Sequence, residues 1–410
     1  MPFANLGAQV LNANLCTGCG ACVLACPERL VRMEGLKPRA DDATSDRCGQ
    51  CTDCLKTCPG RDPATPDLER ALFGRTRRPD ERWLGIFTEI LAGHATDPVT
   101  FDRSGSGGSV TALLATAMTA LPLDGVLVAG RDTGEPWRAA PHLCEEPSEL
   151  HAYAQATYQL SAHLAALDEM LRSDESRRVG LVGLACHIQA VRKLQGLQTP
   201  LGARARERIV FLLEIACSSS THPEGTSTII TGILGIALDD VAAVHYRDGD
   251  YPGKFVVTTR DGVRHALPLW QAIRHLKEYK THRCLSCPDW LSGVADLAVF
   301  DGDPNIFEAS RQQHSKFPKH GTILVRTPVG ASVIKAAERL ATMRAWPGTI
   351  YAYNLGLDRK RHRRRSYELS GADIPNGPIP GHEDDIAIVP DEQLLGLSAE
   401  AVATPRTRGD

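Results

Sequence analysis

Two short runs of closely spaced cysteines constrain this chain more than any other feature. The runs read CTGCGACVLACP, from Cys16 to Pro27, and CGQCTDCLKTCP, from Cys48 to Pro59. Both have the spacing C-x2-C-x2-C-x3-C-P, whose two-residue gaps allow three thiolates to wrap around one cubane of iron and sulfide. The proline after the last cysteine fixes φ and turns the chain away from the cluster. Both runs are therefore predicted to bind iron–sulfur clusters.

The spacing also predicts that the two runs exchange ligands. In the bacterial ferredoxin pattern, the fourth cysteine of each run ligates the cluster of the other run. Disulfides are disfavoured because they need an oxidising compartment, and zinc sites usually show two separate C-x2-C pairs. The expected ligand sets are Cys16, Cys19, Cys22 and Cys58 for one [4Fe–4S] cluster, and Cys48, Cys51, Cys54 and Cys26 for the other.

Composition and charge narrow the cellular setting. The first residues, MPFANLGAQV, show no basic segment followed by an apolar core, so no signal peptide is expected. The sequence has no apolar run of about 20 residues, which argues against a membrane span. The net charge of −3 is too small for bulk attraction of nucleic acid. We therefore expect a cytoplasmic protein with neither a membrane span nor a nucleic-acid partner.

The chain is expected to divide into four segments. Residues 1–60 hold both cysteine runs and are predicted to form a 2[4Fe–4S] ferredoxin-type domain. Residues 61–83 are polar and rich in charge and proline, as in a linker. A larger domain is expected over 84–355, and residues 356–410 combine a basic segment with a polar tail that is expected to be mobile.

Alternating strand-like and helix-like patterns fill the larger domain. Such alternation is typical of an α/β fold with a largely parallel sheet. In 241–269, β-branched runs and an RDG turn instead indicate an inserted antiparallel β-ribbon. The strand-like segments are 84–90, 124–130, 178–183, 208–217 and 294–300, and the helical ones are 110–121, 161–173 and 188–195. The predicted fold is an α+β ferredoxin-like module fused to an α/β domain that carries the ribbon.

A glycine-rich turn opens the helical segment 110–121. The stretch DRSGSGGSVTALLATAM begins at Asp102, and such a turn presents free N–H groups and the positive end of a helix dipole to an anion. The pyrophosphate of a flavin nucleotide would fit there. The turn matches neither GxGxxG nor a Walker loop, and a flexible Gly/Ser turn is an equal alternative. The candidate cofactor-binding residues of the turn are Ser104, Gly105, Ser106, Gly107, Gly108, Ser109, Val110 and Thr111.

Five stretches of the larger domain resemble signatures of one family, the coenzyme F420 hydrogenase/dehydrogenase β subunits. They are SGSGGSVTALLATAMTALPLDGVLVAG, AQATYQLSAH, VGLVGLACHIQAVRKL, YRDGDYPGKF and HRCLSCPDWLSGVADLAVFDGD, in the family's order over roughly residues 84–305. The family comprises iron–sulfur flavoproteins, among them subunits that reduce F420 or oxidise its reduced form and reductases of chlorophyll precursors. The resemblance implies FAD in the α/β domain, fed by the clusters, with the glycine-rich turn as its phosphate cradle.

The resemblance adds two flavin-binding candidates and two departures from the family pattern. Tyr158 is one candidate, and Lys254 in YPGKF either faces the flavin or simply follows a turn. The family usually shows Gly-Thr-Pro-Cys where this chain has GLAC at 183–186, and Ser-Lys-Tyr where it has ATY at 156–158. The missing Lys and Thr leave the substrate and the electron donor open.

Five cysteines lie outside the two runs. Cys186 and Cys217 each follow a strand-like segment, and ligands bind where the carboxyl ends of parallel strands meet. Cys284 and Cys287 form a C-x2-C pair in HRCLSCPDW. These four are predicted ligands of a third [4Fe–4S] cluster beside the flavin, with buried structural cysteines or half of a zinc site as the alternatives. Cys144 is expected to be structural.

The acid–base and docking candidates have weaker support. His187, Asp289, His282 and Lys280 lie in the motif-bearing stretches. Each is a candidate proton donor or an anchor for an anionic substrate, or else a structural residue. The basic run DRKRHRRRSYE, at 358–368, is either a solvated face or a docking surface for an acidic ferredoxin or a polyanionic ligand.

These features predict an FAD- and [4Fe–4S]-dependent oxidoreductase. The clusters would exchange single electrons with FAD, and coenzyme F420 would be the two-electron partner. Ferredoxin or another redox protein is the expected one-electron partner. A ferredoxin-dependent reductase of a small organic substrate is the alternative enzyme, and a non-catalytic electron-transfer subunit of a larger redox complex is the other alternative. The terminal substrate, the direction of electron flow and the oligomeric state are left open by the sequence.

Overall fold

The structure, a computed structural model, describes most of the chain up to residue 345. The described residues are 2–40, 45–78, 81, 84–250, 253–287, 289–301, 319–340 and 344–345. The segment expected at 356–410, with its basic run at 358–368, lies outside them. Within the described residues, no helix has the length and apolar character that crossing a membrane requires.

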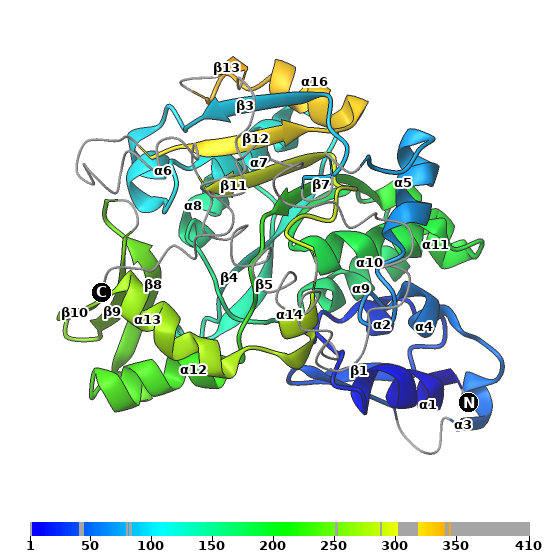
Figure 1. Cartoon of the computed structure of the whole chain (residues 1–410), viewed down its shortest axis with the longest axis horizontal. Helices are drawn as coiled ribbons and strands as arrows, with labels where there is room; N and C mark the ends of the chain where they lie inside the picture. The colour runs from blue at the N-terminus through cyan, green and yellow to red at the C-terminus, as the bar shows by residue number, and fades with distance from the viewer. Residues whose placement is uncertain are drawn as a thin grey trace, which may run out of the picture.

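The N-terminal module is a small α+β unit built around its cysteines. Leu6, Leu15, Leu30 and Leu55 are buried together with cysteine side chains. A core this small supplies little apolar burial, which is why units of this size usually depend on metals or disulfides. The module's elements are α1 (Pro2–Leu6), the π-helix η1 (Gly7–Leu11), α2 (Ala21–Leu24), β1 (Val31–Glu34), β2 (Lys37–Ala40), α3 (Ser45–Cys48) and α4 (Asp53–Thr57) (Figure 1).

A mixed sheet forms the centre of the larger domain. In the described part of the chain its order is β13-β3-β12-β11-β7-β6-β4-β5. The strands are β3 (Glu89–Gly93), β4 (Gly125–Arg131), β5 (Ala139–Cys144), β6 (Val179–Gly183), β7 (Ile209–Ile215), β11 (Leu297–Asp301), β12 (Gly321–Val325) and β13 (Arg344–Ala345). β4, β6, β7 and β11 are parallel to one another, whereas β5, β12, β3 and β13 pair antiparallel to their neighbours.

The parallel centre confirms the expected α/β fold, and the antiparallel edges are the part that the sequence did not predict. β4, β6, β7 and β11 each begin within a predicted strand segment. Segment 84–90 contributes only its end to β3. β5 reads AAPHLC, and its proline and lack of strict alternation hide it as an edge strand.

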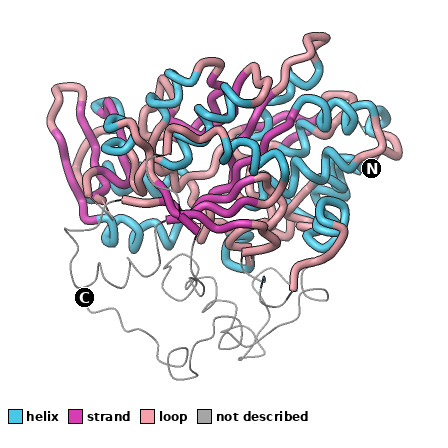
Figure 2. Tube along the Cα trace, turned by 90° about the horizontal axis from the view of Figure 1, so that it is seen from above, coloured by secondary structure: helices cyan, strands magenta, loops and turns pink. Residues whose placement is uncertain are grey.

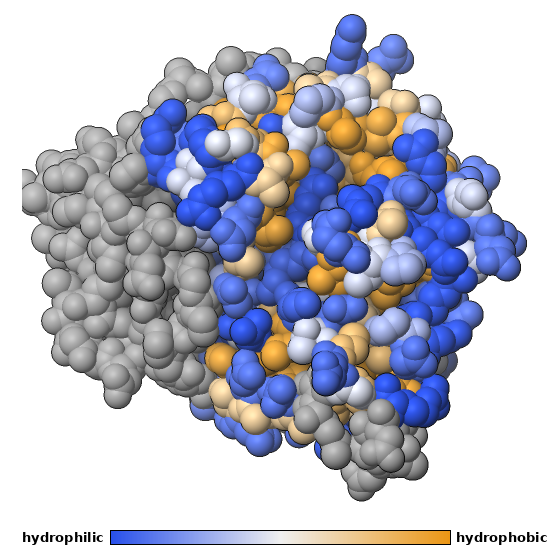
Figure 3. All heavy atoms as spheres, turned by 90° about the vertical axis from the view of Figure 1, so that its right-hand side faces the viewer, coloured by the Kyte–Doolittle hydropathy of each residue, from blue (hydrophilic) through white to orange (hydrophobic). Residues whose placement is uncertain are grey.

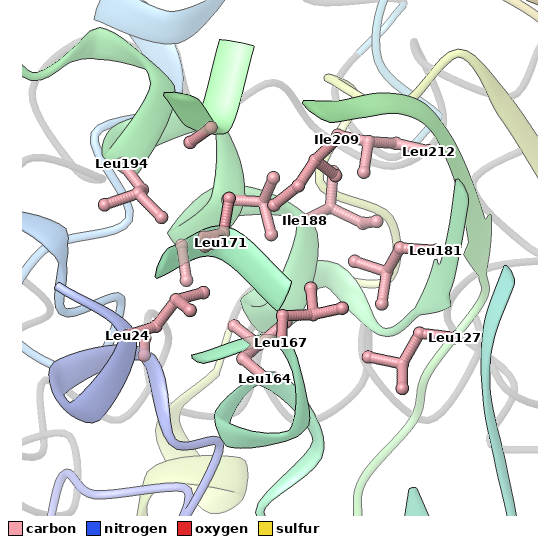
Figure 4. Packing of buried hydrophobic residues seen from close by; sticks show 14 of the residues in the cluster. Leu24, Leu127, Leu164, Leu167, Leu171, Leu181, Ile188, Leu194, Ile209 and Leu212 are labelled. Carbon is pink, nitrogen blue, oxygen red and sulfur yellow. The ribbon is translucent and has the colours of Figure 1, made fainter. Parts of the chain in front are cut away.

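Helices cover both faces of the sheet, because alternate strand residues point to opposite sides. Leu127, Leu181 and Leu212 point into one core, which Figure 4 shows beside Ile188 and Leu194. The helices of this face are α9 (Asp168–Arg172), α10 (Ala185–Gly196) and α11 (Pro200–Arg208). The helices of the other face are α7 (Ser109–Ala120), α8 (Leu150–Tyr153) and α16 (Pro328–Lys335).

The expected antiparallel ribbon is confirmed between β7 and β11. Its strands are β8 (Val241–Asp248), β9 (Lys254–Thr259) and β10 (Arg264–Pro268), and α12 (Pro223–Thr228), the π-helix η6 (Ile229–Ile233) and α13 (Leu269–Leu276) accompany them. Tyr246 and Phe255 are fully buried in its core. The ribbon and the N-terminal module lie at opposite ends of the long axis (Figures 1 and 2).

The N-terminal module shares a core with the larger domain. Leu24 of α2 packs with Leu164 and Leu167 (Figure 4). The backbone N–H of Leu164 donates to the carbonyl of Cys19 at 2.8 Å. Hydrophilic residues cover most of the outer face at this end of the molecule, with smaller apolar patches between them (Figure 3). The module is therefore packed against the domain.

The expected linker at 61–83 contains a helix, α5 (Thr65–Phe73), and a buried ion pair. The carboxylate of Glu69 accepts from the guanidinium of Arg77 at 2.6 Å, and both side chains are almost fully buried. Arg77 also donates to the carbonyl of Ser292 in the larger domain, at 2.6 Å. These bonds explain how so polar a segment is held against the domain.

Short helical turns complete the described structure. Two of them place residues of the candidate site, because α6 precedes the glycine-rich turn and α14 carries the first cysteine of the C-x2-C pair. The turns are α6 (Pro98–Arg103), α14 (His282–Ser286) and the 3₁₀-helices η4 (Pro147–Glu149), η5 (His163–Leu167), η7 (Leu238–Asp240) and η8 (Lys277–Tyr279).

Candidate redox site

Four of the predicted cluster ligands, which we call the first group, lie together where the module meets the larger domain. The pKa of the Cys19 thiol is raised to about 12, first by burial and then by the neighbouring Cys58 and Cys16. The pKa of Cys22 is raised well above its usual value by burial and by these three other thiols. Cys58 comes from the second run, so the four thiols are grouped as the crossed pattern expects.

The other four cysteines of the runs form the second group. The pKa of Cys54 is raised to about 12, first by burial and then by the thiols of Cys26, Cys48 and Cys51. Cys26 comes from the first run, so the exchange between the runs is reciprocal. Cys54 is also among the thiols that raise the pKa of the buried Cys22, so the two groups are neighbours.

The local sequence turns backbone N–H groups toward these thiols. The N–H of Gly18 donates to the sulfur of Cys16 at 3.4 Å, and the N–H of Leu30 donates to that of Cys26 at 3.3 Å. Gly18 takes φ +67°, and a Cβ there would lie 2.9 Å from the carbonyl oxygen of Leu36. The glycine therefore permits the tight turn, and the donated bonds favour the thiolate form.

The third group lies beside the first. Cys186 is in the first turn of α10 after β6, and Cys217 follows β7, so the carboxyl ends of two neighbouring parallel strands supply them. Burial raises the pKa of Cys186 well above its usual range. The neighbouring thiols that raise this pKa further are Cys19, Cys217, Cys284 and Cys287. Because Cys19 belongs to the first group, the first and third groups are neighbours.

Sets of four thiols suit [4Fe–4S] clusters, which take one thiolate at each iron. In the described part of the chain, no set of three or more His, Cys, Asp or Glu side chains is arranged to hold a single metal ion. Thiols whose pKa is raised by burial need a nearby cation to ionise, and coordination to iron would supply it. Cys144 belongs to none of the three groups. It lies on β5 and is buried among apolar side chains, which fits the structural role expected for it.

The glycine-rich turn at the start of α7 is packed tightly against its own chain. Gly107 and Gly108 take φ of +81° and +76°. A Cβ on Gly107 would lie 2.5 Å from the carbonyl oxygen of Lys319, and one on Gly108 would lie 2.8 Å from Cγ2 of Thr100. The turn needs both glycines for its own geometry, whatever ligand it binds.

Two serine hydroxyls of this turn are engaged within the protein. Ser109 is buried and donates to the carbonyl of Gly93 at 2.6 Å. Ser104 donates to the carbonyl of Phe101 at 2.8 Å. These two hydroxyls therefore help to position the turn. The half-buried members of the turn are Ser104, Gly105, Ser106, Val110 and Thr111.

Two cations beside the turn were not singled out from the sequence. Arg247 donates to the carbonyl of Gly105 at 3.2 Å, and its guanidinium pairs with Asp301 at 2.5 Å. Ser106 also donates to Asp301. Lys319 donates to the carbonyl of Ser104 at 3.0 Å. Arg247 lies in the stretch YRDGDYPGKF, whereas Lys319 precedes a strand that the sequence did not predict.

Tyr158 and Lys254 lie on the side of the ribbon. The ring of Tyr158 meets that of Tyr246 edge-on, with centroids 5.1 Å apart. Lys254 is exposed at the start of β9, where its backbone lies opposite that of Asp248 in the antiparallel register with β8. The preceding residue, Gly253, packs against Arg247, because a Cβ there would lie 2.8 Å from the Arg247 backbone. The strand register thus brings the Lys254 segment close to the glycine-rich turn.

His187 is a buried, neutral imidazole. Burial lowers its pKa well below the usual value, and the neighbouring His163 lowers it further. The two rings stack with centroids 5.0 Å apart. The N–H of Leu184 donates to Nδ1 of His187 at 3.4 Å, which leaves the ring proton on Nε2. His187 can donate a hydrogen bond, but its low pKa argues against a charged proton donor.

The other three acid–base candidates lie in different surroundings. Asp289 is buried and accepts from the side-chain amide of Gln189 at 3.0 Å. Lys280 is half-buried, and its backbone pairs with that of Thr221. His282 is exposed at the start of α14. Of the four candidates, only His187 and Asp289 are buried in the interior.

Family models match most of the described chain. The model of the coenzyme F420 hydrogenase/dehydrogenase β-subunit N-terminus matches residues 90–168, and that of the C-terminus matches 176–345. A 4Fe–4S dicluster domain model matches residues 15–61, which carry both cysteine runs. The matches to the β subunit therefore begin after the module.

Individual proteins agree with the family models. The coenzyme F420 hydrogenase subunit beta of Methanococcus voltae is 31% identical over 216 residues, covering 52% of this chain and 72% of that protein. The chloroplastic 7-hydroxymethyl chlorophyll a reductase of Oryza sativa subsp. japonica is 24% identical over 340 residues, covering 79% of this chain and 68% of that protein. This chain is thus similar to a hydrogenase subunit and to a pigment reductase.

A solved structure shares the fold. A chain from the F420-reducing [NiFe] hydrogenase complex of Methanosarcina barkeri superposes with a TM-score of 0.55 at 21% identity, covering 72% of this chain and 97% of that one. The fold, the cysteine runs and the sequence matches agree. The chain belongs to the coenzyme F420 hydrogenase/dehydrogenase β-subunit family and carries a 4Fe–4S dicluster domain near its N-terminus.

Proposed function

We propose that this protein is an iron–sulfur flavoprotein oxidoreductase that passes electrons between [4Fe–4S] clusters and FAD, with coenzyme F420 as its two-electron partner. The observation that carries the proposal is the contiguity of the three cysteine groups. Cys54 neighbours Cys22, and Cys19 neighbours Cys186, so the second, first and third groups follow one another into the α/β domain. When bound, the clusters supply one-electron steps and the flavin converts them to two-electron chemistry.

The third group is the proposed link to the flavin domain. Its cysteines come from the ends of β6 and β7 and from the region of α14, so that they would join three parts of the domain around one cluster. The N–H of Ser220 donates to the sulfur of Cys284 at 3.4 Å. Such a bond stabilises a coordinated thiolate and tunes the potential of its cluster.

The glycine-rich turn and its two cations are the proposed seat of the flavin pyrophosphate. The N-terminus of α7, a helix of 12 residues, directs N–H groups and a positive dipole end toward the turn. Arg247 is almost fully buried, and its guanidinium is held beside Gly105 and Ser106. The guanidinium also pairs with Asp301, so Arg247 would hold the turn in shape while the N–H groups and the dipole of α7 attract the diphosphate.

Reduced coenzyme F420 tests the proposed two-electron partner. The full-length protein, prepared anaerobically with bound flavin, is mixed with reduced F420, and the flavin absorbance is followed. Rapid bleaching is expected. Bleaching by dithionite but not by reduced F420 would contradict F420 as the partner while leaving the flavin assignment intact.

One observation favours a second candidate, a reductase of a small organic substrate with ferredoxin as electron donor. The match to the rice 7-hydroxymethyl chlorophyll a reductase covers 79% of this chain, against 52% for the Methanococcus voltae subunit. Under this proposal, reduced ferredoxin would bleach the flavin and an organic acceptor would reoxidise it. A stable complex with a catalytic partner, and no turnover by this chain alone, would instead support an electron-transfer subunit.

A further inference from the structure

An arginine at the end of β4 carries a charge that no carboxylate of the described residues neutralises. The guanidinium of Arg131 donates to the carbonyls of Val244 at 3.2 Å and Ala156 at 3.0 Å. It also donates to the hydroxyl of Thr157 at 2.6 Å and, at 3.4 Å, to the carbonyl of Gly130. All of these acceptors are neutral, so the hydrogen bonds satisfy the guanidinium without compensating its charge.

The other surroundings of Arg131 do not remove this charge either. Burial lowers the pKa of the guanidinium, and among the groups that the structure describes only the phenol of Tyr246 opposes the shift. Burial in turn raises the pKa of Tyr246, so this phenol is neutral. The guanidinium lies over the Tyr246 ring, 5.0 Å from its centroid, and an aromatic face attracts a cation without neutralising it. Because an arginine keeps its proton in proteins, Arg131 is a net cation.

Two hydrogen-bond donors at this place are not used by bonds within the described chain. Nη2 of Arg131 carries two N–H groups, and the bond to Ala156 uses one of them. Thr157 accepts from Nη1 through its oxygen, which leaves its own O–H to donate. Arg131 and Thr157 are both half-buried, so each keeps some exposed surface. A cation beside a hydroxyl donor suits an oxyanion, which accepts charge-assisted hydrogen bonds.

These two donors lie at the edge of the sheet that also supplies the third group. Arg131 is the last residue of β4, which runs parallel to β6, and Cys186 follows β6. The segment 158–160, directly after the hydroxyl donor, pairs with Thr221, and the N–H of the residue before Thr221 donates to the sulfur of Cys284. Ligands of α/β sheets bind where the carboxyl ends of the strands meet, and Arg131 lies at such an end.

We propose that Arg131 and Thr157 anchor an oxyanion group, a carboxylate or a phosphate, of the two-electron substrate. The inference rests on the proposed function and names the class of substrate that its site accepts. A partly buried cation without a counter-ion costs free energy, and a bound anion removes that cost. An acidic substrate is thereby held at the sheet edge to which the third group leads, whereas a neutral substrate gains nothing from the charge of Arg131.

A structural role alone would make Arg131 a bridge between β4, β8 and the segment 156–157. Both roles predict that loss of Arg131 destabilises the protein, so stability by itself does not separate them. The separating readout is the rise of the unfolding temperature with added anion, because a bound anion makes stability depend on its concentration. Inorganic phosphate and acetate are the probes, added anaerobically to the full-length protein at an ionic strength held constant with sodium chloride.

Replacements of Thr157 give the sharpest variants, because its hydroxyl is 2.6 Å from the guanidinium. Thr157→Asp places a carboxylate beside Arg131 and is expected to weaken binding of the tighter probe by at least about tenfold. Thr157→Asn is the neutral control of the same shape and is expected to keep most of the response. Arg131→Gln removes the cation and is expected to lose the response. Arg138→Gln is expected to keep it, because Arg138 is exposed and pairs with Glu135 at 3.1 Å.

The same anion response in wild type, Thr157→Asp and Thr157→Asn would overturn the inference, and so would a wild-type protein that responds to neither probe. If Arg131→Gln does not fold, the two Thr157 variants decide. Binding of oxidised F420, whose side chain is acidic, is followed by its own fluorescence. Weaker binding to Thr157→Asp than to Thr157→Asn supports the anchor, and equal binding overturns it for this substrate. A wild-type protein that binds phosphate through Arg131 but not F420 would refute the proposed partner and leave the anchor in place.

Discussion

At the scale of single residues, spacing made the eight cysteines of the module predictable. Their expected pairing into two crossed sets follows from the C-x2-C-x2-C-x3-C pattern, and the neighbours of Cys19 and Cys54 agree with it. Two contacts that hold the module to the larger domain had no comparable signal. Lys193 donates to the carbonyl of Cys58, 135 residues earlier in the sequence, and Arg283 donates to that of Pro59, 224 residues earlier. Such contacts depend on how α10 and α14 pack against the module.

The third group can be tested by removing one thiol. In a Cys284→Ser variant we expect a loss of about four irons per chain, because a serine hydroxyl is a poor replacement for a thiolate. Iron and sulfide analysis of the purified protein measures the change. Cys144→Ser is the control, since Cys144 is a buried cysteine outside all three groups. Equal iron loss in both variants would point to unfolding and would remove the support for this group.

His163 is expected to make the stability of the protein depend on pH. Burial lowers its pKa to about 4, from the usual value of 6.5. Between these values the unfolded chain binds a proton that the folded protein does not, so stability is lost as the pH falls from 6.5 toward 4. We expect a loss on the order of 1 kcal/mol per pH unit in this window.

Anaerobic urea unfolding at neutral pH and at an acidic pH inside this window measures the effect. A His163→Gln variant lacks the titrating group, so its unfolding midpoint is expected to change less between the two conditions. His222→Gln is the control, because His222 is exposed. The same pH dependence in wild type and in His163→Gln would speak against this account.

At the scale of elements, the strands of the parallel centre were predictable, because each is a short apolar segment. The helices at 110–121, 161–173 and 188–195 were expected too, whereas α8, α11 and α16 were not. The antiparallel strands were harder. β12 reads GTILV and gives no sign that it pairs with β3, more than two hundred residues earlier, as well as with β11. The segment 61–83 was predicted to be a linker because it is rich in charge. The sequence does not show that two of these charged residues, Glu69 and Arg77, form a buried ion pair.

The glycine-rich turn makes a prediction about α7 and the flavin. In a Gly107→Val variant, the new side chain would meet the carbonyl of Lys319 and occupy φ of +81°, so the turn must move. We expect the purified protein to lose most of its flavin, measured by absorbance after denaturation. Gly262→Val is the matched control, because its φ is +86° but a Cβ there meets nothing within 4 Å. Full flavin occupancy in Gly107→Val would exclude the turn as the phosphate cradle.

The buried ion pair of the 61–83 segment makes a prediction about stability. An Arg77→Ala variant leaves the carboxylate of Glu69 buried without its charge partner, and we expect destabilisation of about 3 kcal/mol. Thermal or urea unfolding measures it. Arg70→Ala is the control, because Arg70 forms an exposed ion pair with Asp67, at 2.8 Å, on α5, the helix that also carries Glu69. A similar small effect in both variants would show that the segment is only loosely attached.

At the scale of the whole molecule, the proposed redox sites follow one another along the long axis. The module lies at one end of the long axis and the ribbon at the other, with the parallel centre of the sheet between them (Figure 1). The three cysteine groups begin in the module and end at the carboxyl ends of β6 and β7. The glycine-rich turn and Arg247 lie beyond them, where the ribbon joins the domain. The sequence could predict the cysteine groups and the glycine-rich turn but not Arg247, and only the fold orders them.

The proposed relay of three clusters serves one flavin, and counting iron, sulfide and FAD in the full-length protein purified anaerobically tests it. We expect about twelve irons and about twelve sulfides per chain, four for each cluster, with about one FAD. About eight irons would leave only the two clusters of the module, and a protein without flavin would contradict the claim altogether.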